Sequence, residues 1–108
     1  MAQSETGSGN FQPLSEIDRI VHEPARLLIL ACLSVVESAE FLFLMNQTGL
    51  TRGNLSSHLS KLEAAGYIEV KKEFVEKIPR TLLRLTETGK RAFVSYRNNM
   101  KQVLERFP

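Results

Sequence analysis

The side chains best suited to contact a ligand lie between Thr51 and Ala65, on one side of an expected helix. On a wheel at about 100° per residue, Leu55, Leu59 and Leu62 cluster within about 60° and define the buried side. The other side and its flanks carry mostly small, polar residues: Arg52, Gly53, Asn54, Ser56, Ser57, His58, Ser60, Lys61 and Ala64. Solvated faces without a function usually carry long charged side chains instead. This helix is therefore predicted to approach another surface closely.

The major groove of duplex DNA fits such a face, because it admits an α-helix. Asn54 can make a bidentate contact to adenine, and the serine hydroxyls can bond to base edges or phosphates. Arg52 begins the helix, where a side chain points most directly into the groove, and it is assigned to a guanine or a phosphate. We assign Lys61 and His58 to phosphates. A histidine beside an apolar stripe is also commonly a boundary residue, and that alternative for His58 stays open.

A charged hairpin is expected after this helix. Residues 67–71 alternate apolar and polar as a half-buried strand does, and residues 81–85 can be the return strand. Residues 72–80 are then expected to form a long, exposed tip. We expect Lys77 and Arg80 to contact DNA, Arg80 above all, because the preceding proline stiffens the chain and an arginine can enter a narrow minor groove. The alternative is that these charges only keep a strand edge from aggregating.

Two earlier helices must hold the groove-facing helix in place. One runs from about Glu40 to Thr48, capped near Ser38, and ends at Gly49, which readily adopts the left-handed conformation. With Thr51 as the N-cap of the next helix, this is a helix-turn-helix. The helix opened by Pro24 is apolar nearly all round, which predicts burial on several sides.

The two ends of the chain are expected to differ. Residues 1–12 are too polar to order and are predicted to be a disordered tail. Leu14, Ile17, Ile20 and Val21 have the spacing of a short amphipathic helix.

The final helix, about residues 87–107, carries a heptad seam of Phe93, Tyr96, Met100, Val103 and Phe107. The seam can pack on its own domain or on a second copy. Three small helices and a hairpin leave little to cover it, which favours a homodimer, and Leu14 and Ile17 are added to the dimerisation surface.

Charge is unevenly distributed along the 108 residues. Residues 1–50 carry 2 basic and 6 acidic side chains, a net −4, whereas residues 51–108 carry 12 basic and 6 acidic, a net +6. A basic second half favours a polyanionic partner, although a mixed-charge solvated face gives similar counts.

Catalysis and membrane insertion are not expected. The two histidines fall on different helices, and the sequence has neither a metal-ligand cluster nor a glycine-rich phosphate loop, so we expect no enzyme, metal or cofactor. The most apolar stretch, residues 25–36, is too short to span a bilayer, and no signal peptide precedes it. The lone Cys32 is expected to be a core residue in a reducing compartment, which suggests a cytoplasmic protein. The length of 108 residues, 43% of them apolar, suggests a single domain, residues 13–108.

Residues 51–68, which end in Gly66-Tyr67-Ile68, together with residues 85–90 after the hairpin, resemble the winged-helix transcription regulators of bacteria and archaea. The sequence is similar to the MarR and ArsR groups. It resembles more closely a compact stand-alone winged-helix family, in which residues 22–30 open the core helix and residues 79–81 close the wing. The resemblance covers about residues 14–98.

The resemblance implies a mainly α fold with a small β-hairpin, a winged helix-turn-helix with a C-terminal dimerisation helix. It further implies a homodimer with a transcriptional role and a palindromic operator. The matching positions for DNA contact are Arg52, Asn54, Ser57, Lys61 and Arg80. The paired cysteines of metal-sensing ArsR proteins and the longer helices of the MarR ligand cleft are missing, so no metal or small-molecule effector is assigned.

These observations predict a homodimeric, sequence-specific regulator of transcription that binds double-stranded DNA and represses by blocking a promoter. The acidic first half and the net charge of only +2 support an alternative, a winged helix used for protein contacts in a larger transcription or repair assembly. An RNA-binding winged helix is a third hypothesis. The alternatives predict, respectively, weak non-selective DNA binding and no preference for duplex DNA.

Overall fold

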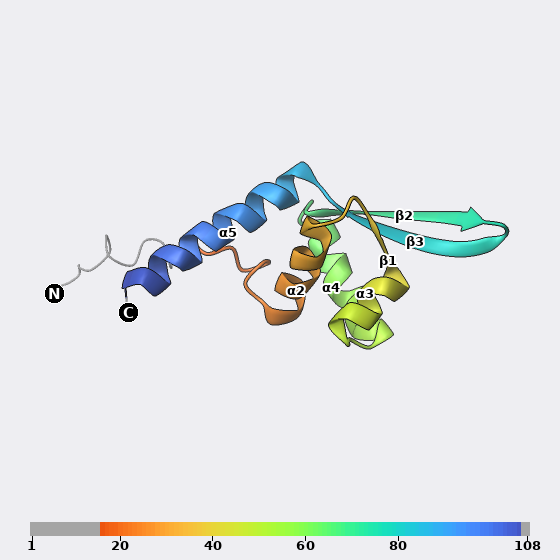
Figure 1. Ribbon diagram of the computed structural model, residues 1–108, viewed down its shortest axis with the longest axis horizontal. Coiled ribbons are helices and arrows are strands. Elements are labelled where there is room, and N and C mark those ends of the chain that lie inside the picture. The colour runs from red at the N-terminus through yellow and green to blue at the C-terminus, as the bar shows by residue number, and fades with distance from the viewer. Residues whose placement is uncertain (1–15, 107–108) are drawn as a thin grey trace.

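The computed structural model describes residues 16–106, which form four helices and a three-stranded antiparallel sheet, a winged helix-turn-helix as predicted (Figure 1). The elements in chain order are α2 (Pro24–Ser34), β1 (Ala39–Glu40), α3 (Phe41–Thr48), α4 (Arg52–Ala64), β2 (Ile68–Val75), β3 (Ile78–Leu85) and α5 (Glu87–Arg106). The sheet order is β1-β3-β2. The expected disordered tail, residues 1–12, and the dimerisation residues Leu14 and Phe107 lie outside the described residues.

Residues 16–23, which we call the strap, make turns, so the amphipathic helix expected there is wrong in its described part. Asp18 explains the difference. Its Oδ1 accepts hydrogen bonds from the N–H of Ile20 at 2.8 Å and of Val21 at 3.2 Å, a local pattern that competes with helix formation. The apolar residues still pack inward, because Val21 is fully buried and Ile17 is partly buried against the core.

Helix α2 begins at Pro24 as predicted, and its N-cap is Glu23, whose Oε1 accepts from the N–H of Arg26 at 2.7 Å. The helix packs against α3, α4, α5 and β3, as the predicted burial on several sides requires. Ile29, Leu30 and Leu33 are in the core, whereas Leu28 is 43% exposed. Cys32, expected in the core, is half-buried against it.

The helix-turn-helix follows its sequence signals closely. Gly49 ends α3 with a φ of 72°, and the Thr51 hydroxyl caps α4 by accepting from the N–H of Asn54 at 3.2 Å. The start of α3 differs from the expectation, since Ala39 and Glu40 pair with β3 instead of beginning the helix. Ser38 is therefore not the cap, because Glu40 occupies that position without a side-chain bond.

The hairpin is longer and more regular than expected. Strands β2 and β3 pair from Ile68 and Leu85 out to Val75 and Ile78, so the tip is exposed as expected but much shorter than residues 72–80. The turn is only Glu76-Lys77, with φ values of 53° and 68°, as a type I′ turn requires. Pro79 fits within β3 because β1 pairs only with Leu82 and Leu83, which leaves no third strand beside the proline.

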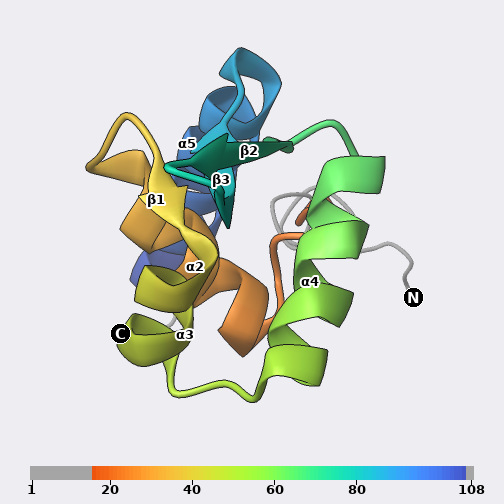
Figure 2. The same cartoon turned by 90° about the vertical axis from the view of Figure 1, so that its right-hand side faces the viewer.

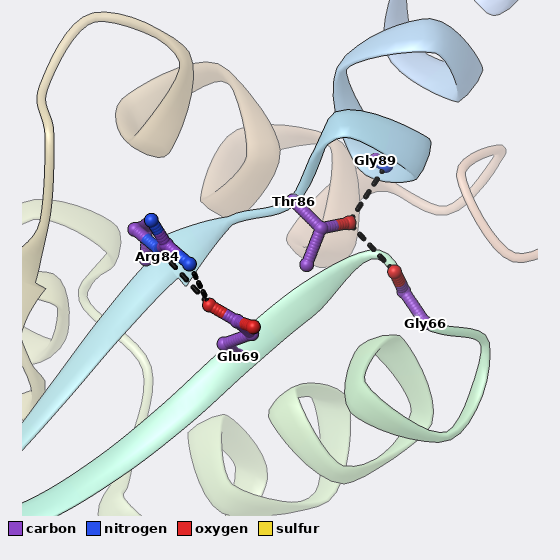
Figure 3. Close-up of polar contacts among 5 residues, drawn as sticks. All are labelled: Gly66, Glu69, Arg84, Thr86 and Gly89. Carbon is purple, nitrogen blue, oxygen red and sulfur yellow. Dashed lines mark hydrogen bonds and ion pairs between the residues drawn. The ribbon is translucent and has the colours of Figure 1, made fainter.

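The start of α5 is fastened to the end of α4. The Thr86 hydroxyl donates to the Gly66 carbonyl at 2.6 Å and accepts from the N–H of Gly89 at 2.9 Å (Figure 3). Gly89 packs so closely on the backbone of Tyr67 that a β-carbon would lie 2.9 Å from the Tyr67 carbonyl carbon. From this junction α5 and the hairpin extend in opposite directions (Figure 1). Among residues 16–106, no helix is long and apolar enough to cross a membrane.

Candidate nucleic-acid interface

Helix α4 lies along one flank of the molecule (Figure 2), and the residues of its polar face are exposed. Leu55, Leu59 and Leu62 are buried beneath it, as the wheel predicts. The exposed residues include these predicted DNA contacts: Arg52, Asn54, Ser56, Ser57, Ser60 and Lys61. The structure therefore brings these six side chains together on one accessible surface.

His58 is placed differently from the other predicted contacts. Its Nδ1 lies 3.2 Å from Nη1 of Arg26 and 3.9 Å from Oε1 of Glu23, and only 20% of its side chain is exposed. Arg26 is itself buried, and its Nε donates to the Ile20 carbonyl at 2.6 Å. His58 thus has internal partners, as the boundary alternative describes, and it fixes α4 to the start of α2.

The charged neighbours in this cluster change the pKa of Glu23. Burial alone would raise the pKa of this carboxyl, but the backbone hydrogen bond from Arg26, and the neighbouring His58 and Arg26 side chains, outweigh burial and lower its pKa. Glu23 is therefore an ionised cap on α2 at neutral pH.

A concave surface of about 490 Å³ lies between α4, the hairpin and the start of α3. Arg52, Ser56 and Ser60 line it from α4, and Lys72 and Thr81 line it from the hairpin. The Arg52 guanidinium also lies 5.3 Å from the ring centroid of Phe41 on α3, a cation–π contact that orients the side chain at the start of α4. The hairpin face with Lys72 is thus the face beside α4.

The two faces of the hairpin differ in whether their positively charged side chains form ion pairs. On the face away from α4, Lys71 Nζ lies 3.6 Å from Glu73, Arg80 Nη2 lies 3.5 Å from Glu40, and Arg84 Nε donates to Glu69 at 3.0 Å (Figure 3 shows the last pair). The hydrogen bond to Glu69 raises the pKa of Arg84. By contrast, Lys72 and Lys77 make no ion pair with any residue in 16–106. Unpaired positive charge therefore remains beside α4 and at the turn.

Arg80 was expected at the tip of the hairpin. It lies instead within β3, opposite Glu73. The tip residues are Glu76 and Lys77, so Lys77 is at the turn. The sequence did not assign Lys72 or Phe74 to a face of the hairpin, because residues 72–80 were expected to form an exposed tip between the strands. The sequence feature that could have placed them is the in–out alternation of side chains in residues 68–71. Continued to residue 75, it puts Lys72 and Phe74 on the face beside α4.

The predicted dimerisation seam is divided between the protomer's own core and an open groove. Tyr96 is buried, and its hydroxyl lies 2.9 Å from Nδ1 of His22 in the strap. Phe93 and Met100 are partly buried against the core, and Val103 is half-buried. Beside them, a largely apolar groove of about 580 Å³ separates α2 from the outer half of α5. Its lining includes Leu27, Ala31, Phe93, Met100 and Leu104.

A helix-turn-helix with an exposed, small-residue second helix and a hairpin beside it defines a winged-helix DNA-binding protein. The sequence model of the winged helix DNA-binding domain matches residues 25–104, and the chain belongs to this family. Its fold is that of the MarR-like transcription regulators.

Relatives are found in sequence and in structure. The chain is 38% identical over 78 residues to an uncharacterized protein of Methanocaldococcus jannaschii, covering 72% of this chain and 85% of the relative. A transcriptional regulator homologue from Pyrococcus horikoshii OT3 is similar in structure with a TM-score of 0.82 and 30% identity, over 87% of this chain and 95% of the other. A MarR family regulator from Silicibacter pomeroyi has a TM-score of 0.63 at 18% identity, over 98% of this chain and 80% of the other.

Proposed function

We propose that this protein is a homodimeric transcription regulator that binds double-stranded DNA sequence-specifically and represses by occupying a promoter. The carrying observation is the polar face of α4, where Arg52, Asn54 and Ser57 are exposed above a buried leucine stripe. In this proposal α4 enters the major groove, Arg52 and Asn54 bond to base edges, and Lys61 binds a phosphate. The hairpin lies over the neighbouring minor groove and presents Lys72 and Lys77 to the backbone.

The homodimer rests on the groove between α2 and α5. Leu104, which lines this groove, is 65% exposed, and Leu28, the neighbour in sequence of the lining residue Leu27, is 43% exposed. A second copy that brings its own α5 would cover this surface by the same pairing on both sides, which is the usual arrangement of a symmetric dimer. Two copies related in this way match a palindromic operator with half-sites one helical turn apart.

The dimer is tested with Leu104→Asp, which places a charge at the centre of the proposed contact. Light scattering at tens of micromolar should give a dimer mass for the parent protein and a monomer mass for this variant. Leu42→Asp is the matched control, because Leu42 is similarly exposed at 56% but lies on α3. A monomer mass for the parent protein would contradict the proposed dimer.

Sequence-specific binding is tested by selecting bound sequences from a random duplex pool and titrating the recovered site at two salt concentrations. Non-specific binding falls steeply with salt, whereas base contacts persist. The double variant Arg52→Ala, Asn54→Ala should bind the recovered site about 30-fold or more weakly, since each bidentate base contact is worth about 1–3 kcal/mol.

The control for this variant is Arg91→Ala, Asn98→Ala, which removes the same residue types from exposed positions on α5. It should bind as the parent does. If the α4 variant also binds as tightly as the parent, the assignment of α4 is wrong. If no sequence is enriched, the winged helix serves protein contacts instead, and if single- or double-stranded RNA competes better than duplex DNA, the nucleic acid is RNA.

A further inference from the structure

The end of the hairpin is apolar on both faces, although it projects beyond the helices (Figure 1). Phe74, which is 75% exposed, stands opposite Pro79 on the face beside α4. Val75 and Ile78 stand opposite each other on the other face and are 38% and 63% exposed. Covering an exposed phenyl ring with a partner is favourable, because apolar surface is then removed from water.

The charges around Phe74 indicate an anionic partner. Lys72 lies two residues away on the same face, and Lys77 lies in the turn beside Glu76. None of the three is paired within residues 16–106, so together they leave one net positive charge (two cations and one anion) around Phe74. The other face, with Ile78, has its cations neutralised by Glu40, Glu69 and Glu73. The partner must therefore accept an aromatic ring and positive charge together on the α4 side. Duplex DNA offers both, as stacked bases between two rows of phosphates.

The reach of the hairpin agrees with this partner. Val70 is partly buried against the core, and Phe74 is four residues further along the strand, about 13 Å at 3.3 Å per residue. Adjacent major and minor grooves are about half a helical turn apart, about 17 Å. The two lengths are of the same order. The two-residue turn and the cross-strand pairing with Pro79 fix the backbone at Phe74.

We propose that Phe74 is a minor-groove wedge. While α4 occupies the major groove, the tip enters the adjoining minor groove, Phe74 inserts between two base pairs and partly unstacks them, and Lys72 and Lys77 bind the flanking phosphates. This inference rests on the proposed function of α4. Apolar wedges of this kind kink DNA by about 20–90°. Pyrimidine–purine steps such as TA unstack most easily, so Phe74 confers a preference for such a step at a position that α4 does not touch.

The test uses the full chain and the duplex recovered by selection, with 2-aminopurine placed in turn at each step flanking the α4 contact. Insertion of Phe74 raises 2-aminopurine fluorescence at one step, and end-to-end energy transfer reports the bend. Phe74→Ala should abolish both signals and lower affinity about 5- to 160-fold, the range for loss of one base–aromatic stack worth about 1–3 kcal/mol. Replacing the TA step by GC should weaken the parent protein but not this variant.

Ile78→Ala is the matched control, because it removes an apolar side chain of similar exposure from the other face of the same tip. It should keep the fluorescence signal, the bend and the affinity. If anisotropy shows tight duplex binding while no step unstacks, or if the two alanine variants bind alike, the wedge is refuted and the proposed function stands. If the parent protein binds no duplex, both fail, and the apolar tip is a protein-binding surface.

Discussion

Replacing Gly89 by alanine is expected to loosen the junction between α5 and the rest of the fold. The new methyl would press on the carbonyl oxygen of Tyr67 and lie 2.9 Å from its carbonyl carbon and 2.8 Å from Leu85 Cδ1, whereas ordinary contact begins at 3.4 Å. Two of these three atoms are backbone, so the helix must move. That movement stretches the 3.0 Å hydrogen bond from the Thr86 N–H to the Tyr67 carbonyl.

The magnitude follows from these contacts. Overpacking a filled site costs about 1–3 kcal/mol. The weakened hydrogen bond adds about 1 kcal/mol, and the better helix propensity of alanine returns about 1 kcal/mol. The net loss of about 1–3 kcal/mol lowers Tm by about 5–20 °C for a domain of this size.

Thermal unfolding followed by circular dichroism, at one protein concentration, measures this loss. Gly53→Ala is the control, since Gly53 lies in helix α4 with nothing within 4 Å of an added β-carbon. It should raise stability by up to about 1 kcal/mol. If Gly89→Ala unfolds within about 0.5 kcal/mol of the parent, which is the ordinary range of neutral surface changes, the close approach is not a constraint on the fold.

The remaining predictions concern charge. Lys72→Ala should lower the slope of log affinity against log salt by about 1, whereas Arg80→Ala, which removes a cation already paired, should change it less; the reverse order would contradict the assignment of the hairpin faces. Burial, and then the hydrogen bond to Asp18, raise the pKa of Tyr67 to about 12, so its neutral form stabilises the fold below pH 10 and that stability is lost as pH rises through 12. In a Tyr96→Phe variant, which leaves Tyr67 as the one tyrosine, the midpoint of tyrosinate absorbance should lie near pH 12. Adding Asp18→Asn to this variant should lower the midpoint. A midpoint near pH 10 with Asp18 present would be inconsistent with the hydrogen bond.

Elements with local signals could be predicted from the sequence. The boundaries of α4 followed from the Thr51 hydroxyl at its start and the glycines around it, and its exposed face followed from the spacing of three leucines. These signals suffice because capping and burial of one helix depend on neighbours within a few residues. Most of the candidate DNA-binding surface could therefore be predicted from the sequence.

Elements that depend on distant pairing could not be predicted. Glu76-Lys77 lacks the glycine or asparagine that marks a type I′ turn, so the strand pairing, which reaches Val75 and Ile78, was hidden by charged residues. Without the register, the faces of Lys72 and Phe74 were unknown. In the strap, one carboxylate that bonds to the backbone outweighed an apolar spacing typical of a helix.

In the proposed dimer, the strap limits how the two half-sites of an operator can be spaced. It contacts α5 through His22 and Tyr96, and Arg26, which bonds to the strap's Ile20 carbonyl, contacts α4 through His58. A dimer built on α5 would therefore hold its two α4 helices at one separation and one angle, without a flexible joint between them. Inserting a single base pair between two half-sites moves the second by about 3.4 Å and rotates it by about 36°. On such an operator only one of the two α4 helices could enter its major groove at a time. The proposed dimer would therefore discriminate against it through the spacing of its half-sites alone, without any change in the bases contacted.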